Sequence, residues 1–148
     1  MTLSEKVTTD MKVAMKAGNK ERLETLRMLR AQILEFEKRG LDRKMNEEDE
    51  LSILMTAVKR RKEAIEMYEK ASRNDLVQKE SKELEIISEY LPKQVSQEEA
   101  TAIIEKIIAS TGAASVKDLG KVMPLAVKEL KGKIDNKTIS EIVKSKLS

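Results

Sequence analysis

Apolar residues recur three and four positions apart along almost the whole chain, and no segment shows the two-residue alternation of a half-buried strand. The first of these apolar stripes consists of Leu3, Val7, Met11, Ala14 and Met15. Glycines and short polar residues interrupt the pattern at intervals, as they do where one helix ends and another begins. The sequence therefore predicts an all-α protein with about seven helices and no sheet.

Four of the expected helices precede Pro92. Gly18 and Gly40 end the first two, and Asn19 caps the second, so we expect these two to pack as a hairpin. The apolar stripe of the second helix is Leu23, Leu26, Leu29, Ile33 and Leu34.

A third, longer helix is expected to begin after Asn46, whose partner Asp49 stands three residues later, and to run to about Ala71. The residues expected to face inward from it are Leu51, Leu54, Met55, Val58, Ile65 and Tyr68. A turn over residues 72–75 leads into a fourth helix, and together these predict a long antiparallel helical pair.

Beyond the proline the pattern restarts, which divides the chain into an N-terminal helical subdomain, 1–92, and a small C-terminal helical subdomain, 93–148. Ser96 and Ser115 each begin a helix, and Asp135 or Asn136 caps the last, giving a three-helix bundle. Pro124 falls within the middle helix and predicts a kink or break there, because proline cannot donate to the carbonyl of residue 120.

Composition excludes much of the usual enzyme chemistry. The chain contains no cysteine and no histidine, which rules out structural zinc sites, thiol nucleophiles and imidazole catalysis. Its glycines lie too far apart to form a phosphate-binding loop, and its carboxylates alternate with lysine and arginine on helix faces. We therefore expect no catalytic residues, no metal and no cofactor.

No apolar run approaches the length of a membrane span, and the N-terminus does not resemble a signal peptide. On this basis we expect a cytoplasmic protein without membrane association.

The positive charge is concentrated in the second subdomain. Residues 1–92 carry 19 basic and 19 acidic side chains, whereas residues 93–148 carry 10 basic and 7 acidic ones. The lysines that could neutralise RNA phosphates there are Lys117, Lys121, Lys128, Lys131 and Lys133. The alternative interpretation of these lysines is an ordinary solvated surface.

Several short segments together resemble the GatB/YqeY family. They are Lys59-x-Arg61-x-Glu63, Ala71-x-Arg73-x-Asp75-Leu76, Glu83-Leu84, Tyr90-Leu91-Pro92, Gly120-Lys121-Val122-Met123 and Gly132-Lys133-x-Asp135. Three positions depart from the family pattern: Ser72 and Pro124 stand where glycine is common, and Ile134 where a small residue is usual.

The resemblance implies an all-helical protein related to tRNA amidation. In the B subunit of the aspartyl/glutamyl-tRNA amidotransferase this domain forms the C-terminal tail, thought to engage the tRNA. The family is labelled carbon-nitrogen ligase with glutamine as amido-N-donor, but the ATP site and the ammonia-generating amidase of that complex lie in other domains and subunits. The chain is therefore expected to be a non-catalytic module that binds tRNA or a tRNA-charging or amidotransferase assembly.

A second hypothesis is a protein-protein adaptor that uses the long helical pair without direct RNA contact. Lys59, Arg61, Arg73 and Asp75 would then form a polar network within the chain or with a partner. A third hypothesis, a ligase or amidase acting alone, is the least favoured of the three.

Overall fold

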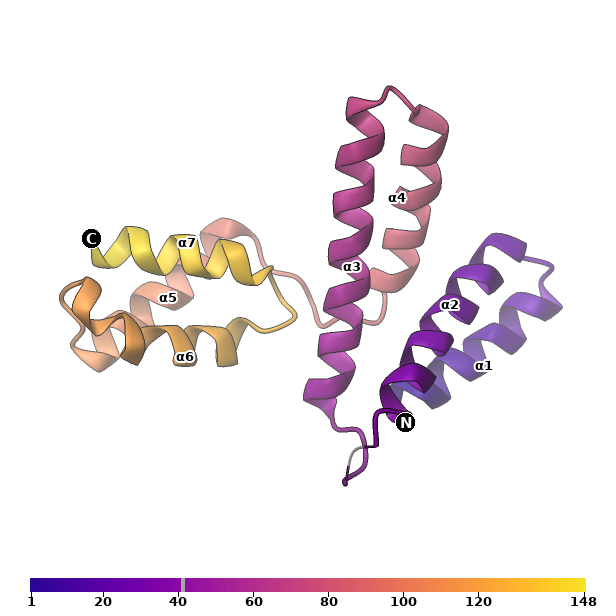
Figure 1. Ribbon diagram of the computed structural model, residues 1–148. Coiled ribbons are helices and arrows are strands. Elements are labelled where there is room, and N and C mark those ends of the chain that lie inside the picture. The colour runs from indigo at the N-terminus through magenta and orange to yellow at the C-terminus, as the bar shows by residue number, and fades with distance from the viewer. Residues whose placement is uncertain (41) are drawn as a thin grey trace. The chain divides into compact units, whose positions relative to one another are not determined.

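The computed structural model describes residues 1–40 and 42–148, and this part of the chain contains seven α-helices, one short 3₁₀ helix and no strand. The predicted all-α fold is confirmed. The helices divide into two compact units, Met1–Leu91 and Pro92–Ser148 (Figure 1). Each unit has its own hydrophobic core.

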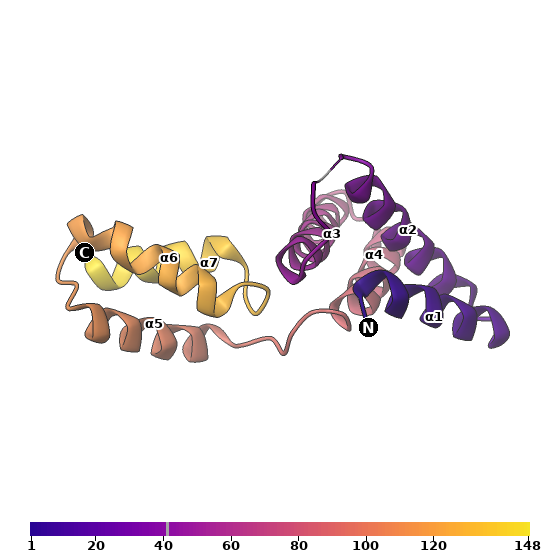
Figure 2. The same cartoon turned by 90° about the horizontal axis from the view of Figure 1, so that it is seen from below.

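The first unit consists of two helical hairpins (Figures 1 and 2). Helices α1 (Leu3–Lys16) and α2 (Lys20–Glu37) form one, and α3 (Glu47–Lys70) and α4 (Asn74–Ser88) form the other. Helix α2 also packs against α4 and α3, so both hairpins share one core. The buried residues of this core are Leu3, Val7, Leu26, Leu29, Ile33, Ile53, Leu54, Ala57 and Ile87.

Local capping chemistry sets the helix starts in this unit. The Asn19 side chain accepts from the backbone N–H of Arg22 at 3.2 Å, and Asn46 and Asp49 cap each other's backbone N–H groups at 2.9 Å. Both caps were predicted, because each satisfies backbone donors that have no partner inside the helix.

The end of α4 is tied to the first hairpin by polar contacts. The Tyr90 hydroxyl donates to the carboxylate of Asp10 on α1, and Arg22 on α2 pairs with Glu89 at 2.7 Å. Burial and the Asp10 hydrogen bond raise the pKa of Tyr90, so this hydroxyl keeps its proton. The Tyr90-Leu91-Pro92 element therefore ends the first unit with a residue fixed to its core.

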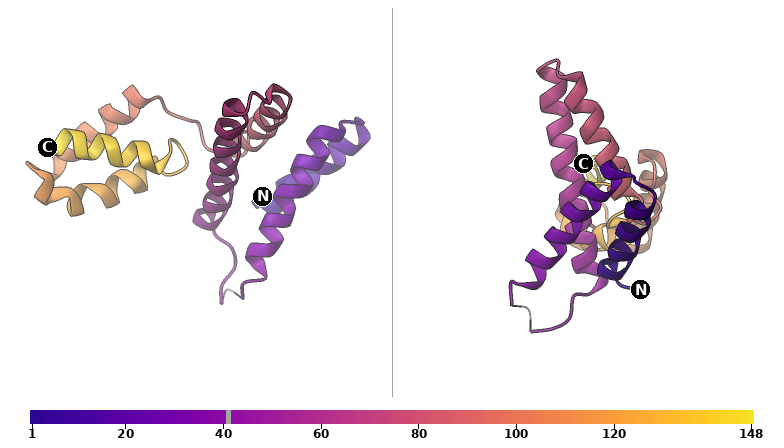
Figure 3. Two further views of the ribbon diagram at one scale, coloured as in Figure 1. Left: turned by 45° about the horizontal axis from the view of Figure 1, so that its top comes forward. Right: turned by 90° about the vertical axis from the view of Figure 1, so that its right-hand side faces the viewer.

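The second unit contains α5 (Gln97–Thr111), the 3₁₀ helix η1 (Val116–Asp118), α6 (Leu119–Leu130) and α7 (Asn136–Leu147). Helices α6 and α7 lie side by side, and α5 packs against both (Figures 1 and 3). The buried residues of this unit's core are Ala100, Ile104, Val122, Ala126, Leu130, Ile139, Ile142, Val143 and Leu147.

Of the kink or break predicted at Pro124, the break is wrong, because α6 continues from Leu119 to Leu130 with the proline inside it. Pro124 lies in the second turn of α6, where it removes only the donor to Gly120. Val122 and Ala126, on either side of the proline, are completely buried, and their packing holds the helix together across it.

Some expected inward positions are also wrong. Met15 and Leu34 are 58% and 42% exposed, whereas Ile53 and Ala57 on α3 are buried although the stripe assigned to that helix omits them. Met15 and Leu34 lie at the edge of their apolar faces, whereas Ala57 lies in the middle of the buried face of α3, so the inward face of that helix was predicted too far round its axis.

Candidate nucleic-acid interface

The outward face of α6 and η1 carries three of the five candidate lysines. Lys121 and Lys128 are exposed and stand seven residues apart, which is about two turns and roughly 10 Å along the helix axis. Lys117 extends the same surface onto η1. Val122 and Leu130 occupy the opposite face and are fully buried, so the burial of the apolar face points the lysines toward solvent.

A carboxylate lies at one end of this lysine face. Asp118 accepts from the backbone N–H groups of Ala114 and Ser115 at 2.9 and 3.3 Å, and these hydrogen bonds lower its pKa. Its other oxygen lies 3.7 Å from the Lys121 ammonium. The Lys121 side chain is 71% exposed, so this ion pair is screened by water and leaves the ammonium accessible to an incoming anion.

Lys131 and Lys133 belong to the tight turn between α6 and α7. Lys131 has φ −57° and ψ 126°, Gly132 has φ 79°, and the Lys133 N–H donates to the Leu130 carbonyl at 2.9 Å, which defines a type II turn. Glycine suits the third position because the turn requires a positive φ there.

The segment before α5 is hydrogen-bonded to this turn. The Gln94 side-chain amide donates to the Gly132 carbonyl at 2.6 Å, and the Val95 N–H donates to the Lys133 carbonyl at 2.9 Å. Lys131 and Lys133 are partly buried. The five candidate lysines thus comprise one on η1, two on α6 and two at the turn that follows α6.

The four residues of the alternative polar network lie in three different environments within the first unit. Arg73 and Asp75 form a two-bond ion pair at 3.0 and 3.2 Å at the exposed tip of the α3–α4 hairpin. Arg61 is buried within the unit, and Lys59 is exposed on α3. Apart from the Arg73–Asp75 pair, no hydrogen bond or ion pair among the described residues joins any two of the four, so they do not form a single network within the chain.

Arg61 is a buried cation that the sequence patterns did not place in the core. Its Nη1 donates to the Ala57 carbonyl at 3.1 Å, and its Nε lies 3.5 Å from a Glu83 carboxylate oxygen without forming a hydrogen bond. Burial and the nearby Glu80 outweigh the attraction of Arg61 and raise the pKa of Glu83. The one feature of the sequence that could have indicated the burial of Arg61 is its position four residues after Ala57, on the same face of α3.

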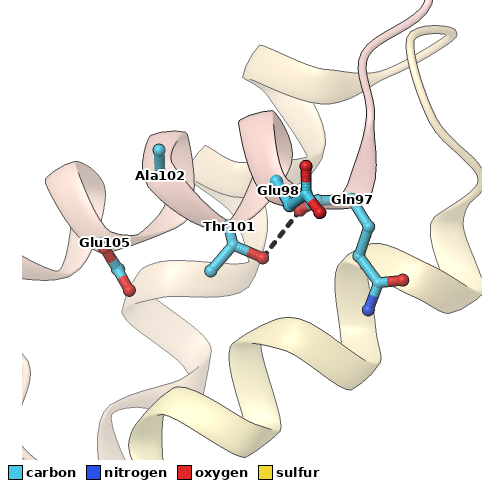
Figure 4. A pocket seen from close by; sticks show the side chains of 5 residues that line it. All are labelled: Gln97, Glu98, Thr101, Ala102 and Glu105. Carbon is cyan, nitrogen blue, oxygen red and sulfur yellow. Dashed lines mark hydrogen bonds between the residues drawn. The ribbon is translucent and has the colours of Figure 1, made fainter.

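Two surface hollows are further places where a ligand could bind. Figure 4 shows one of about 510 Å³, lined only by α5 residues, in which the Thr101 hydroxyl donates to the Gln97 carbonyl at 2.7 Å. The other, about 350 Å³, lies between α2 and α4, and two of its acids, Glu21 and Asp75, already pair with Lys82 and Arg73. Neither hollow brings together unpaired groups that suggest a reaction.

Residues 1–40 and 42–148 contain no cluster of three or more metal-binding side chains. Within the same residues, no helix combines the length and the apolar character that crossing a bilayer requires.

Comparison with known proteins identifies relatives of this chain. An uncharacterized protein of Schizosaccharomyces pombe is 31% identical over 83 residues, which cover 56% of this chain and 67% of the relative. The protein named altered inheritance of mitochondria protein 41, mitochondrial, of Pyrenophora tritici-repentis is 26% identical over 140 residues, covering 92% of this chain and 76% of the relative. The family model for YqeY-like proteins matches residues 4–147, which confirms the resemblance drawn from the motifs. The chain therefore belongs to the YqeY-like protein family.

Proposed function

We propose that the protein is a non-catalytic helical module that binds tRNA, alone or within a tRNA-amidotransferase assembly, through the lysine face of its second unit. The observation that carries the proposal is the set of exposed lysines on η1 and α6, namely Lys117, Lys121 and Lys128, on the side opposite the buried face. Lys131 and Lys133 extend this surface at the following turn.

Lysines in this position contact phosphates and do not read bases. An ammonium on a flexible side chain acts as a point charge, and an α6 face without aromatic residues offers no stacking for bases. Binding should therefore be shape-driven and strongly salt-dependent, because each phosphate contact releases condensed counterions.

Charge reversal on this face tests the proposal. We expect Lys121→Glu/Lys128→Glu to weaken binding to labelled bulk tRNA and to reduce the slope of log affinity against log salt by roughly 1.4–1.8, since each lost contact contributes roughly 0.7–0.9. The matched control is Lys106→Glu/Lys144→Glu, which changes the charge equally at two exposed lysines on α5 and α7 that make no ion pair. Equal affinities and slopes for the two double variants would remove the proposal.

The adaptor hypothesis remains a second candidate because α3 exposes an apolar side chain, Met67, 66% of which is accessible. Purification of the tagged protein after nuclease treatment separates the two ideas. Protein partners that survive nuclease but are lost on Met67→Ser favour the adaptor, and partners lost with the RNA favour the tRNA module.

We propose no reaction for the isolated chain, and we place the protein in the cytoplasm, although one relative is named as mitochondrial. Purified protein supplied with ATP, glutamine and misacylated tRNA should yield no amidated aminoacyl-tRNA. Formation of that product would contradict the non-catalytic assignment, and cell fractionation would test the location.

A further inference from the structure

The outer face of α2, in the first unit, carries a row of cations that the overall charge balance conceals. The row consists of Lys20, Arg27, Arg30 and the C-cap residue Lys38, all exposed. On a helix with 3.6 residues per turn they fall within an arc of roughly 80° and extend about 27 Å along the axis. No carboxylate of α2 falls inside that arc.

Two other charges of α2 are paired within the unit, whereas the exposed Glu24, Glu35 and Glu37 make no ion pair among the described residues. Arg22 pairs with Glu89 at 2.7 Å, and Glu21 pairs with Lys82 at 3.7 Å. Glu21 and Glu24 both face the hollow between α2 and α4. In the described part of the chain no ion pair involves any cation of the row, so all four are free to meet an external anion.

The chemistry of the row favours a phosphate backbone over a protein surface. Beside the cations the arc contains the exposed Leu34 and the half-buried Leu23 and no aromatic residue, and the exposed Ala31 and Glu37 lie about 20° beyond its two edges. Protein interfaces depend on large buried anchors, with tryptophan and tyrosine prominent among them, which this face lacks. A linear array of cations, two of them arginines that can bind phosphate oxygens through two hydrogen bonds, matches a regularly charged polyanion.

We infer that the outer face of α2 is a second RNA-binding surface, which contacts the phosphates of an A-form duplex such as an arm of tRNA. This inference rests on the proposed function, since it assigns further contacts with the same class of ligand. It adds the first unit, which carries equal numbers of acidic and basic side chains, to the binding surface.

The test uses the full chain with Arg27→Glu/Arg30→Glu. Two lost phosphate contacts, each with a salt slope near 0.9, contribute about 15-fold each between 1 M and 50 mM salt, so affinity for tRNA and for a 16-base-pair RNA duplex should fall roughly 200-fold at 50 mM. The control Lys59→Glu/Lys62→Glu reverses two exposed cations on α3 of the same unit. It should change affinity by less than about fivefold, since it affects only the general field of the protein.

Each outcome decides between the two surfaces. An equal loss of RNA affinity in the α2 variant and the α3 control overturns the inference. If only Lys121→Glu/Lys128→Glu loses RNA affinity, the proposed function stands and the α2 surface is ruled out. If only the α2 variant loses RNA affinity, the α2 surface stands and the lysine face of the second unit is ruled out. Unchanged RNA binding together with weakened binding of poly-L-glutamate by the α2 variant would assign the face to acidic proteins and overturn the inference. Circular dichroism confirms that each variant is folded.

Discussion

Ser72 offers a direct test of how this fold is held together at the tip of its long hairpin. It follows the C-cap of α3 with φ 57°, a left-handed conformation that α3 requires in order to end. The Arg73 N–H donates to the Tyr68 carbonyl at 2.9 Å and the Ser72 N–H to the Glu69 carbonyl at 3.1 Å, which together form a Schellman motif. Glycine is the residue that normally occupies this position.

The expected gain from Ser72→Gly follows from two opposing effects. A residue with a Cβ in the left-handed region costs about 1–2 kcal/mol, which glycine does not incur. Glycine in turn makes the unfolded chain more flexible, which lowers the free energy of unfolding by about 0.4–1 kcal/mol. The serine side chain makes no hydrogen bond among the described residues, so nothing else is lost. The net prediction is a stabilisation of about 0.8 kcal/mol.

Tyrosine fluorescence measures this change in the correct unit. The chain has two tyrosines and no tryptophan, and both Tyr68 and Tyr90 lie in Met1–Leu91, so the signal follows unfolding of that unit only. For a unit of this size, 0.8 kcal/mol corresponds to an increase in Tm of roughly 3–6 °C. The urea midpoint should rise in proportion, with an unchanged slope.

Ser52→Gly is the matched control, because Ser52 is exposed in the second turn of the same helix. There glycine should destabilise the unit by about 0.5 kcal/mol, since the backbone is right-handed and gains nothing from losing Cβ. If Ser72→Gly lowered Tm as Ser52→Gly does, the left-handed backbone would not be a source of strain and the reasoning would be refuted.

Two further variants test other features of the fold. Pro124→Ala should raise the Tm recorded by circular dichroism, with a gain of about 1–2 kcal/mol from the hydrogen bond restored to the Gly120 carbonyl; an unchanged Tm would contradict this. For Glu83→Gln the direction of the stability change follows from the raised pKa of Glu83 in the folded state. The folded parent binds the Glu83 proton more tightly than the unfolded chain does. Ionisation of Glu83 therefore lowers the stability of the parent as pH rises above the ordinary pKa of 4.5. The urea midpoint of the variant, relative to that of the parent, should therefore increase between about pH 4 and about pH 7. A decrease of this difference over the same range would show that the attraction of Arg61 for the Glu83 carboxylate outweighs the effect of burial.

Much of the fold could be predicted because its helix ends are set by neighbouring residues. The caps at Asn19, Asn46, Ser96 and Asp135 depend on side chains that reach backbone N–H groups two or three positions away. Such contacts join residues that are close in sequence, so the local sequence predicts them. The continuity of α6 through Pro124 depended instead on packing across the helix, which the local sequence does not record.

The candidate surfaces could be predicted less well, because exposure and pairing depend on tertiary contacts. The dense run Lys59-Arg60-Arg61-Lys62 points in several directions, and its third member is buried beside Glu83. The α2 row, by contrast, is spread over 19 residues, and its members are never adjacent in sequence. These cations share one face only when the segment forms a helix. The ion pair of Arg22 with Glu89 then shows that Arg22 is not among the α2 cations that can bind an external anion.

Membership of a family motif is therefore a poor guide to which residues bind a ligand here. Tyr90 fastens the end of α4 to Asp10, and Gly132 supplies the positive φ of a turn whose carbonyls bind residues 94–95. Folding alone accounts for both residues. A cation can meet an external phosphate only where it is exposed and unpaired or loosely paired, and Lys121 is a motif residue that meets this condition whereas Arg61 does not. Contact residues should thus be sought among exposed cations first, whether or not a motif contains them.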